Sequence, residues 1–246
     1  MDTAHIHTRM PALIMAGYQD QDNKALWMLH GKPMLSYVLA AVQGSKYISE
    51  CVVVGPVSIE PYLQGCRRVD GKPDLVDNVN MGLSLFPTAR YVLYLSSDIP
   101  LLTAAILDTF IQQALDTRAD VIYPVILQAT HEAMYPDCKR TFGKLREGSF
   151  TGGNAWIITN EALANGQPLT QAFIHGRKQI VQLARALGPV TLLRLLTGRL
   201  TIRHAEARVS KLLGGLPVAA VVFPHAALGN DLDHMEEKAV FERYLL

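Results

Sequence analysis

A polar loop with glycine and lysine follows the first apolar segment of the chain. Residues 11–15 are apolar, Ala16 and Gly17 end the run, and Lys24 lies in the loop beyond. Glycine lets backbone N–H groups approach a polyphosphate without a Cβ in the way, and lysine adds a mobile positive charge. The pattern indicates nucleotide binding; an ordinary strand-to-helix connection is the alternative.

Aspartates follow two later apolar segments. Asp98 comes three residues after the run 91–95, in the sequence SSDIP. Asp231 and Asp233 follow the run 218–223. The carboxyl ends of buried parallel strands are where α/β proteins place ligand sites, although each aspartate could instead only cap a loop or helix. Two such carboxylates would suit Mg²⁺, which prefers oxygen ligands.

A third group of chemically capable residues lies in the segment 140–159. Lys144 and Arg146 alternate there with apolar residues, and Gly153 and Asn154 belong to a TGGN sequence that precedes the apolar AWII. Diglycine with Thr and Asn presents several donors and acceptors at close range to a ligand bearing hydroxyl or phosphate groups. The alternative is a β-hairpin with glycine turns and solvated basic residues.

Strands and helices that would position these residues alternate along the chain. The expected strands are 11–15, 51–55, 91–95, 120–127, 155–158 and 218–223, and the expected helices are 34–43, 77–86, 106–115 and 236–245. The cap of the second helix would be Asp77 or Asn78, and that of the third Thr103. Pro124 predicts a bulge or an edge position for its strand, and 62–72 is expected to be a loop.

Composition restricts the class of protein. The 246 residues are 49% hydrophobic, enough for one large α/β domain, 1–246. A net charge of +1 argues against a nucleic-acid partner. The three cysteines form no C-x-x-C sequence, which fits structural roles and a reducing, cytoplasmic location. No apolar run reaches the roughly 18 residues of a membrane span.

A leucine-rich, basic segment interrupts the domain at 166–213. Its pattern predicts two or three amphipathic helices, broken at Gly188-Pro189 and at Gly198. Packing against the sheet edge is the default expectation. Covering of the acceptor pocket, a homodimer interface and peripheral membrane contact through 170–213 are the alternatives.

Several motifs, taken together, resemble one family. The opening motif consists of Leu13, Ala16, Gly17, Lys24, Gly31, Lys32, Pro33 and Met34. Further motifs are SDIP around Asp98, TGGN, the closing DLD, and Asn78 with Val79 and Gly82. They are similar to those of the MobA-like NTP transferases, GT-A-like nucleotidyltransferases that include molybdenum-cofactor guanylyl- and cytidylyltransferases and sugar-phosphate nucleotidyltransferases.

The resemblance implies an α/β fold, a three-layer α/β/α Rossmann-like (GT-A-like) nucleotide-diphospho-sugar transferase fold with a mostly parallel sheet. It also implies Mg²⁺-dependent transfer of an NMP group from an NTP to a phosphorylated small-molecule acceptor. The implied catalytic residues are Lys24, Asp98 and Asp233, with Asp98 and Asp233 as metal ligands. The implied nucleotide-binding residues are Ala16, Gly17, Lys24, Lys32, Asn78 and Gly82, and the acceptor-binding residues are Lys144, Arg146, Gly153 and Asn154.

The glycine loop departs from the family pattern. Tyr18 replaces the second glycine, and the sequence QDQD at 19–22 replaces a segment that carries arginine in the family. Carboxylates beside a triphosphate are repulsive unless a cation intervenes. A catalytically degraded, nucleotide-binding or regulatory protein of the same fold is therefore the alternative function.

Overall fold

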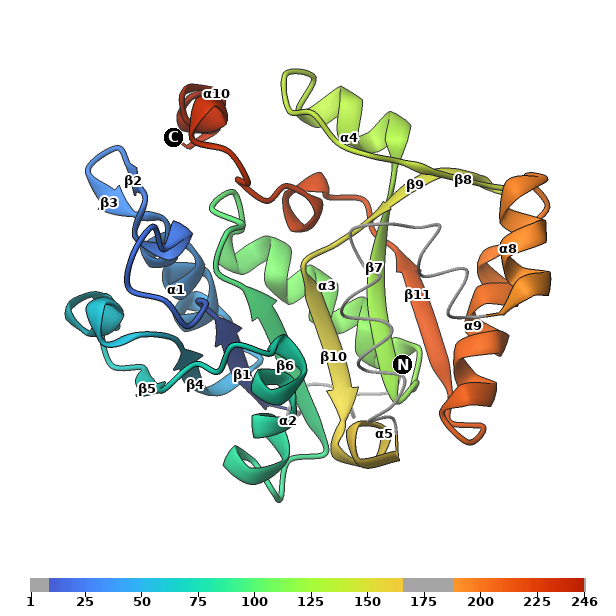
Figure 1. Ribbon diagram of the computed structural model, residues 1–246, viewed down its shortest axis with the longest axis horizontal. Helices are drawn as coiled ribbons and strands as arrows, with labels where there is room; N and C mark the ends of the chain where they lie inside the picture. Colours follow the sequence, from blue (N-terminus) through green and yellow to red (C-terminus); the bar gives the residue numbers. More distant parts are fainter. Residues whose placement is uncertain (1–8, 166–187, 246) are drawn as a thin grey trace.

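A nine-stranded sheet forms the centre of the protein (Figure 1). The structure, a computed structural model, describes residues 9–165 and 188–245. The strand order is β5-β4-β1-β6-β10-β7-β9-β8, and β11 also pairs with β7. The strands are β1 (Met10–Met15), β4 (Ile48–Val54), β5 (Arg67–Val69), β6 (Tyr91–Ser96), β7 (Val121–Leu127), β8 (Gly143–Leu145), β9 (Gly148–Gly152), β10 (Ala155–Thr159) and β11 (Val218–Val222), and a separate hairpin pairs β2 (Met28–Leu29) with β3 (Lys32–Pro33).

Helices cover both faces of the sheet. The described helices are α1 (Met34–Gly44), α2 (Leu75–Leu85), α3 (Ala104–Asp116), α4 (Gln128–Met134), α5 (Asn160–Asn165), α8 (Pro189–Leu196), α9 (Ile202–Leu212) and α10 (Lys238–Tyr244), with 3-10 turns η2 (Lys24–Leu26), η3 (Val57–Tyr62), η4 (Ala226–Gly229) and η5 (Met235–Glu237). One apolar core lies between the sheet and α1 and α3, and a second lies under α2 and α5. The expected three-layer α/β/α arrangement is thereby confirmed.

The central strands of the sheet are parallel and buried. The central strands β1 and β6 are apolar and buried almost throughout, as expected for strands covered on both faces. The run β5-β4-β1-β6 is parallel, and β11 is parallel to β7. Only β9 and β10, among the strands of this sheet, run against the others. The carboxyl ends of β1 and β6 therefore meet at one edge.

An irregularity between β9 and β10 breaks the pairing with β7. Val125 faces Gly152 and Ile122 faces Ile157, so four residues oppose two. The backbone N–H of Gly153 donates to the Pro124 oxygen at 2.9 Å, and a Cβ on Gly153 would lie 2.7 Å from the Pro124 ring. The predicted bulge or edge position of the strand that contains Pro124 is wrong: β7 is continuous and interior, and the extra residues lie in its partner, between β9 and β10.

Two expected boundaries are wrong. Helix α2 begins at Leu75 and not at Asp77, because the Asp74 carboxylate accepts from the Val76 N–H at 2.8 Å and caps the helix two residues earlier. Strand β5 lies inside the segment expected to be a loop. It is a short edge strand that begins with arginines, and such charged edge strands carry no apolar signal in the sequence.

The basic segment before β11 contains α8 and α9. As predicted, a helix begins directly after Gly188, and Gly198 lies in the break between the two helices. Its first part, 166–187, lies outside the described residues. Helix α9 packs on β11, and its Glu206 carboxylate accepts from the edge N–H of Ala220 at 2.8 Å. In the described parts of the chain, every helix is too short or too polar to cross a bilayer. The assignment of 1–246 to one domain stays a prediction.

Candidate functional site

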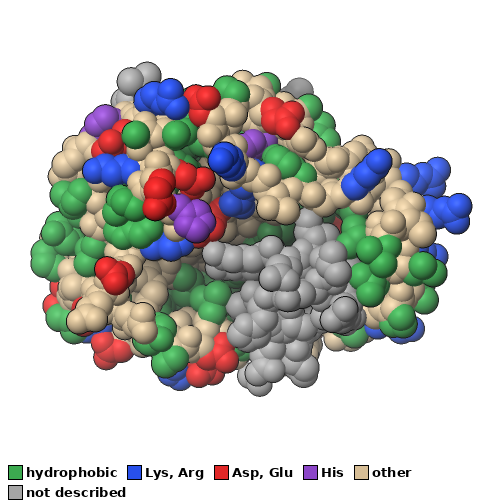
Figure 2. All heavy atoms as spheres, turned by 45° about the horizontal axis from the view of Figure 1, so that its top comes forward, with side chains coloured by type: hydrophobic (Ala, Val, Ile, Leu, Met, Phe, Trp, Pro, Cys, Tyr) green, Lys and Arg blue, Asp and Glu red, His purple; other side chains and the backbone are tan. Residues whose placement is uncertain are grey.

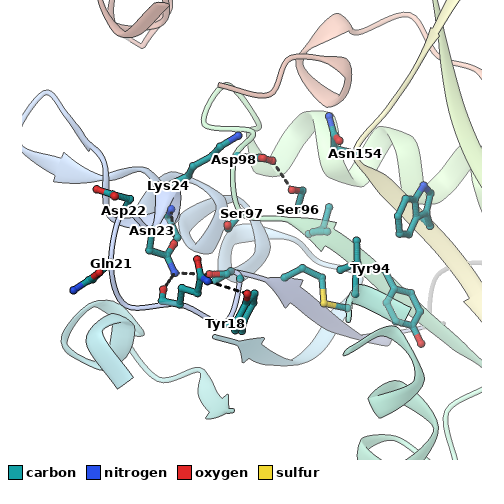
Figure 3. A pocket seen from close by; sticks show the side chains of 18 residues that line it. Tyr18, Gln21, Asp22, Asn23, Lys24, Tyr94, Ser96, Ser97, Asp98 and Asn154 are labelled. Carbon is teal, nitrogen blue, oxygen red and sulfur yellow. Dashed lines mark hydrogen bonds between the residues drawn. The ribbon is translucent and has the colours of Figure 1, made fainter. Parts of the chain in front are cut away.

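A cleft of about 320 Å³ opens at the carboxyl ends of β1 and β6. The segment after β1 forms one wall, and Ser96 at the end of β6, with Ser97 and Asp98 after it, forms the floor (Figure 3). Asn154, from the bulge before β10, lies on the far side. The volume is within the range of small-ligand sites. Side chains from three strand ends therefore converge on one cavity.

The loop formed by residues 17–23, here called the glycine loop, is held by its last side chain. The Asn23 amide donates to the oxygens of Ala16 (2.8 Å) and Gln19 (3.0 Å), and its oxygen accepts from the Ala25 N–H at 2.9 Å. Gly17 has φ +79°, a conformation that favours glycine. Asn23 thus joins the two ends of the loop and caps η2, which begins with Lys24.

Lys24 forms an ion pair with Asp233 across the mouth of the cleft. The two residues are 209 positions apart in the sequence. The C-terminal segment crosses the carboxyl edge of the sheet (Figure 1), and the Leu232 N–H donates to the backbone oxygen of Asp98 at 2.9 Å. This backbone contact places Asp233 beside Asp98.

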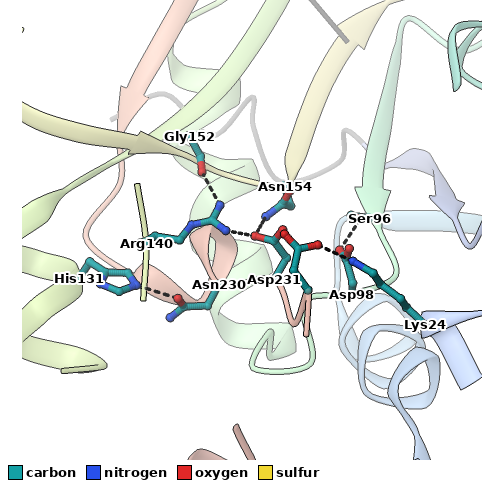
Figure 4. Close-up of polar contacts among 10 residues, drawn as sticks. Lys24, Ser96, Asp98, His131, Arg140, Gly152, Asn154, Asn230 and Asp231 are labelled. Carbon is teal, nitrogen blue, oxygen red and sulfur yellow. Dashed lines mark hydrogen bonds and ion pairs between the residues drawn. The ribbon is translucent and has the colours of Figure 1, made fainter. Parts of the chain in front are cut away.

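The side chain of the neighbouring Asp231 is more buried than that of Asp233. Its side chain is 6% exposed and forms an ion pair with Arg140, which also donates to the Gly152 oxygen at 3.5 Å (Figure 4). The Asn154 amide donates to the same Asp231 oxygen at 3.1 Å. The bulge in β9–β10 therefore fixes Asp231 as well as lining the cleft.

Asp98, Asp231 and Asp233 offer carboxylate oxygens that all lie within 4.8 Å of one another. The hydroxyl of Ser96 donates to Asp98. Three like charges this close repel unless cations lie between them, and Lys24 and Arg140 supply two. An all-oxygen donor set of this kind fits a hard divalent cation such as Mg²⁺.

The residues predicted to be functional fall into two groups. Ala16, Gly17, Lys24, Asp98 and Asn154 line the cleft. The remainder lie outside its lining: Lys32, Asn78, Gly82, Lys144, Arg146, Gly153 and Asp233. Of these, Asp233 reaches the site through Lys24, and Gly153 makes the bulge that positions Asn154.

Asn78 and Gly82 have structural contacts. The Asn78 amide is bonded to the backbone N and O of Lys72, at 2.7 and 2.9 Å. That loop includes Gly71, where a Cβ would lie 2.3 Å from the Gly17 oxygen. A Cβ on Gly82 would lie 2.1 Å from the Tyr94 hydroxyl. Asn78 therefore supports the glycine loop indirectly, through Gly71, and its predicted contact with nucleotide stays a prediction.

The other outlying cations are exposed. Lys32 lies on β3, and Lys144 and Arg146 lie on the β8–β9 hairpin, which is the hairpin arrangement left open by the sequence. Their predicted roles in binding nucleotide and acceptor stay predictions. Sequence reasoning did not single out Arg140, whose importance depends on a partner 91 residues away. Asn23, which precedes a short helix, carried a capping signal.

A buried histidine supports the segment that bears Asp231. His131 shares a hydrogen bond of 2.7 Å with the Asn230 side chain, as Figure 4 shows. Burial lowers the pKa of His131 from its usual 6.5, because desolvation disfavours the imidazolium. Neutral His131 is therefore part of the packing behind the carboxylates.

A mixed, mostly parallel sheet with a glycine loop and a carboxylate cluster at its strand ends defines an α/β protein of the nucleotide-binding class. The model of the MobA-like NTP transferase domain matches residues 8–200. The chain belongs to this family, and the predicted enzyme class, nucleotidyltransferase, is confirmed at the level of the family.

Solved structures agree in fold. A hypothetical transferase from Thermus thermophilus is 31% identical, with a TM-score of 0.82, over 94% of this chain and 99% of its own. CMP:2-keto-3-deoxy-manno-octonic acid synthetase complexed with CTP is 14% identical, with a TM-score of 0.62, over 97% and 98%. A 4-diphosphocytidyl-2C-methyl-D-erythritol synthase from Anaerococcus prevotii DSM 20548 is also 14% identical, with a TM-score of 0.60, over 97% and 98%. No protein of curated function matches the chain by sequence.

Proposed function

We propose that the protein transfers an NMP group from an NTP to a phosphorylated small-molecule acceptor and releases pyrophosphate, with Mg²⁺ as cofactor. An oxygen of the acceptor phosphate forms a bond to the α-phosphorus, and the bond from that phosphorus to the bridging oxygen of the leaving pyrophosphate breaks. The observation that carries the proposal is the cluster of Asp98, Asp231 and Asp233 opposite the glycine loop, with Lys24 between them.

The chain would contribute positioning and charge. Backbone N–H groups near Gly17 approach the phosphates, and Lys24 offsets charge that develops on the leaving group. Asn154 orients the acceptor from the opposite wall. The acceptor needs no general base, because a phosphate monoester is largely ionised near neutral pH.

Asp98 and Asp233 would hold the metal ion, with Asp231 beside them. Bound there, Mg²⁺ supplies positive charge to the phosphate oxygens. Lys24 pairs with Asp233 in the structure, so binding of the cation and the triphosphate would release the ammonium group toward the phosphates. Arg140 would hold Asp231 in place through their ion pair.

Pyrophosphate release from each of the four NTPs, with Mg²⁺ and a panel of phosphorylated acceptors, tests the proposal. CTP is the first nucleotide to try, since the two similar structures named above carry cytidyl groups in their names or ligands. Asp98→Asn should abolish release, whereas Glu50→Gln, at an exposed carboxylate on β4, should leave it unchanged. Release that survives Asp98→Asn would overturn the assignment.

The alternative is a nucleotide-binding or regulatory protein of the same fold. The loop lacks the family's arginine and carries Asp20 and Asp22, which favours this alternative. Asp20, however, accepts from the Ser58 N–H at 3.2 Å and is absent from the cleft lining, so only Asp22 would face a triphosphate. Metal-dependent nucleotide binding without pyrophosphate release from any pair would support the regulatory alternative.

A further inference from the structure

Helix α8 carries a row of exposed aliphatic side chains. Val190, Leu193 and Leu196 are 63%, 63% and 67% exposed. Their i, i+3, i+6 spacing places them on one side of the helix. Single exposed aliphatic residues are common on protein surfaces, but a row along one helix face is typical of an interaction site.

Arginines border this row. The segment 188–204 contains Arg194, Arg199 and Arg203 and no aspartate or glutamate. Arg199 and Arg203 are exposed, and Arg194 is half-buried within α8. Figure 2 shows lysine and arginine side chains projecting at the end of the molecule where α8 lies, next to a patch of hydrophobic side chains. We call the three aliphatic and three arginine residues the α8 surface.

The carboxylates that flank this segment in sequence or space are bonded to backbone. Glu147, from the β8–β9 turn, accepts from the Ile202 N–H at 3.1 Å, and Glu206 accepts from the Ala220 N–H. The Arg146 N–H donates to the Leu200 oxygen at 2.8 Å. These contacts fix the segment after α8 and the start of α9 to the sheet. The N–H groups of Arg199 and Leu200 donate to the Arg194 oxygen at 2.7 and 3.0 Å, so the end of α8 is bonded to that fixed segment.

We propose that the α8 surface docks the protein on an anionic lipid membrane. Aliphatic side chains at the boundary between headgroups and acyl chains, with arginines beside them, are the chemistry that holds a helix in the membrane interface. Arginines attract the negative lipid surface, and the aliphatic row gains by leaving water. A nucleic acid would match the arginines but leave the aliphatic row in water, which favours the lipid.

Docking is reversible, because one short helix with three aliphatic residues buries little apolar surface. It is also sensitive to salt, because the arginine contribution is screened within a Debye length. The proposal does not depend on the enzymatic reaction and could hold for either function considered above.

Cosedimentation of the full chain with lipid vesicles tests the proposal. The wild type should bind vesicles of phosphatidylcholine with phosphatidylglycerol at low salt. Its affinity should be at least tenfold weaker for vesicles of phosphatidylcholine alone, and at least tenfold weaker for either kind of vesicle at high salt. The double variants Leu193→Glu/Leu196→Glu and Arg199→Glu/Arg203→Glu should each lose at least tenfold in affinity for the anionic vesicles.

Matched controls come from elsewhere on the surface. Val57→Glu, at another exposed aliphatic residue, and Lys46→Glu/Arg67→Glu, at exposed cations, should bind as the wild type does. Circular dichroism and thermal unfolding of every variant identify loss of fold, and only variants that melt like the wild type are compared.

Three results would overturn the proposal. One is a wild type that does not bind anionic vesicles at low salt. Another is equal loss of binding in the control and α8 variants. The third is a different occupant: binding of RNA without binding of vesicles, or a dimer in light scattering that dissociates in Leu193→Glu/Leu196→Glu while vesicles are not bound.

Discussion

Removal of the Arg140 guanidinium would show how strongly the carboxylate cluster depends on a resident cation. Arg140→Met keeps much of the aliphatic stem but takes the positive charge from Asp231, whose side chain is 6% exposed. Asp231 would then face Asp98 and Asp233 with oxygens within 4.8 Å. Both of these carboxylates would then repel the charge of Asp231, because Arg140 no longer offsets it.

The size of the effect follows from that distance. Two unit charges 4.8 Å apart repel by about 3.5 kcal/mol at an effective dielectric constant of about 20. Breaking a buried ion pair by removing one partner costs roughly 3–5 kcal/mol. We expect Arg140→Met to lower the free energy of unfolding by about 3 kcal/mol at pH 7 without divalent cations, which corresponds to roughly 6–12 °C in Tm.

The assay is urea unfolding, followed by far-UV circular dichroism, of a double-mutant cycle with Asp231→Asn. Asp231→Asn removes the carboxylate charge that Arg140→Met leaves unpaired. The coupling free energy between the two substitutions should therefore be about 2 kcal/mol. Arg243→Met is the matched control: its ion pair with Asp137, at 3.1 Å, joins side chains 62% and 51% exposed, and such pairs contribute about 1 kcal/mol or less.

Millimolar Mg²⁺ should restore part of the lost stability in Arg140→Met, because a cation bound among the carboxylates replaces the missing charge. Arg243→Met should gain no more from Mg²⁺ than the wild type does. The electrostatic reasoning fails if Arg140→Met costs no more than Arg243→Met, or if the coupling with Asp231→Asn is near zero.

Three other expectations use separate features. Neutral His131 contributes stability that is fully present above the pKa of the unfolded state and is lost as the pH falls toward the lowered pKa of the folded state. In unfolding measurements below pH 6.5, His131→Gln should weaken this pH dependence. An unchanged slope of unfolding free energy against pH would contradict the expectation. A hydrogen bond from the Cys51 thiol lowers the pKa of Cys66 to about 7, whereas burial raises that of Cys138 to about 11; mass spectrometry should show iodoacetamide modifying Cys66 before Cys138 at pH 7, and the reverse order would refute this. Gly71→Ala would place a Cβ 2.3 Å from a carbonyl oxygen of the glycine loop, so calorimetry should show about tenfold weaker nucleotide binding, and unchanged affinity would contradict the role proposed for the loop.

Local sequence patterns determined many of the strands and helices. The apolar runs predicted β1, β6 and β11, and Thr103 caps α3 as expected, because its hydroxyl needs only the N–H of Ile106 three residues on. Asp98 at the end of β6 was identifiable because the carboxyl ends of parallel strands share an edge. The start of α2 was mispredicted, because Asp74 and Asp77 can both cap a helix and the sequence does not distinguish them.

Tertiary structure decided which of these residues meet. Lys24 contacts Asp233, and Arg140 contacts Asp231, across 209 and 91 positions, and neither pair leaves a periodic signal in the sequence. The register shift at the bulge turns Asn154 toward Asp231, while the β8–β9 hairpin leaves Lys144 and Arg146 exposed. Local hydrogen bonds and burial patterns act over a few residues and can be read from the chain, whereas the site depends on strand order and register, which arise from packing of the whole sheet.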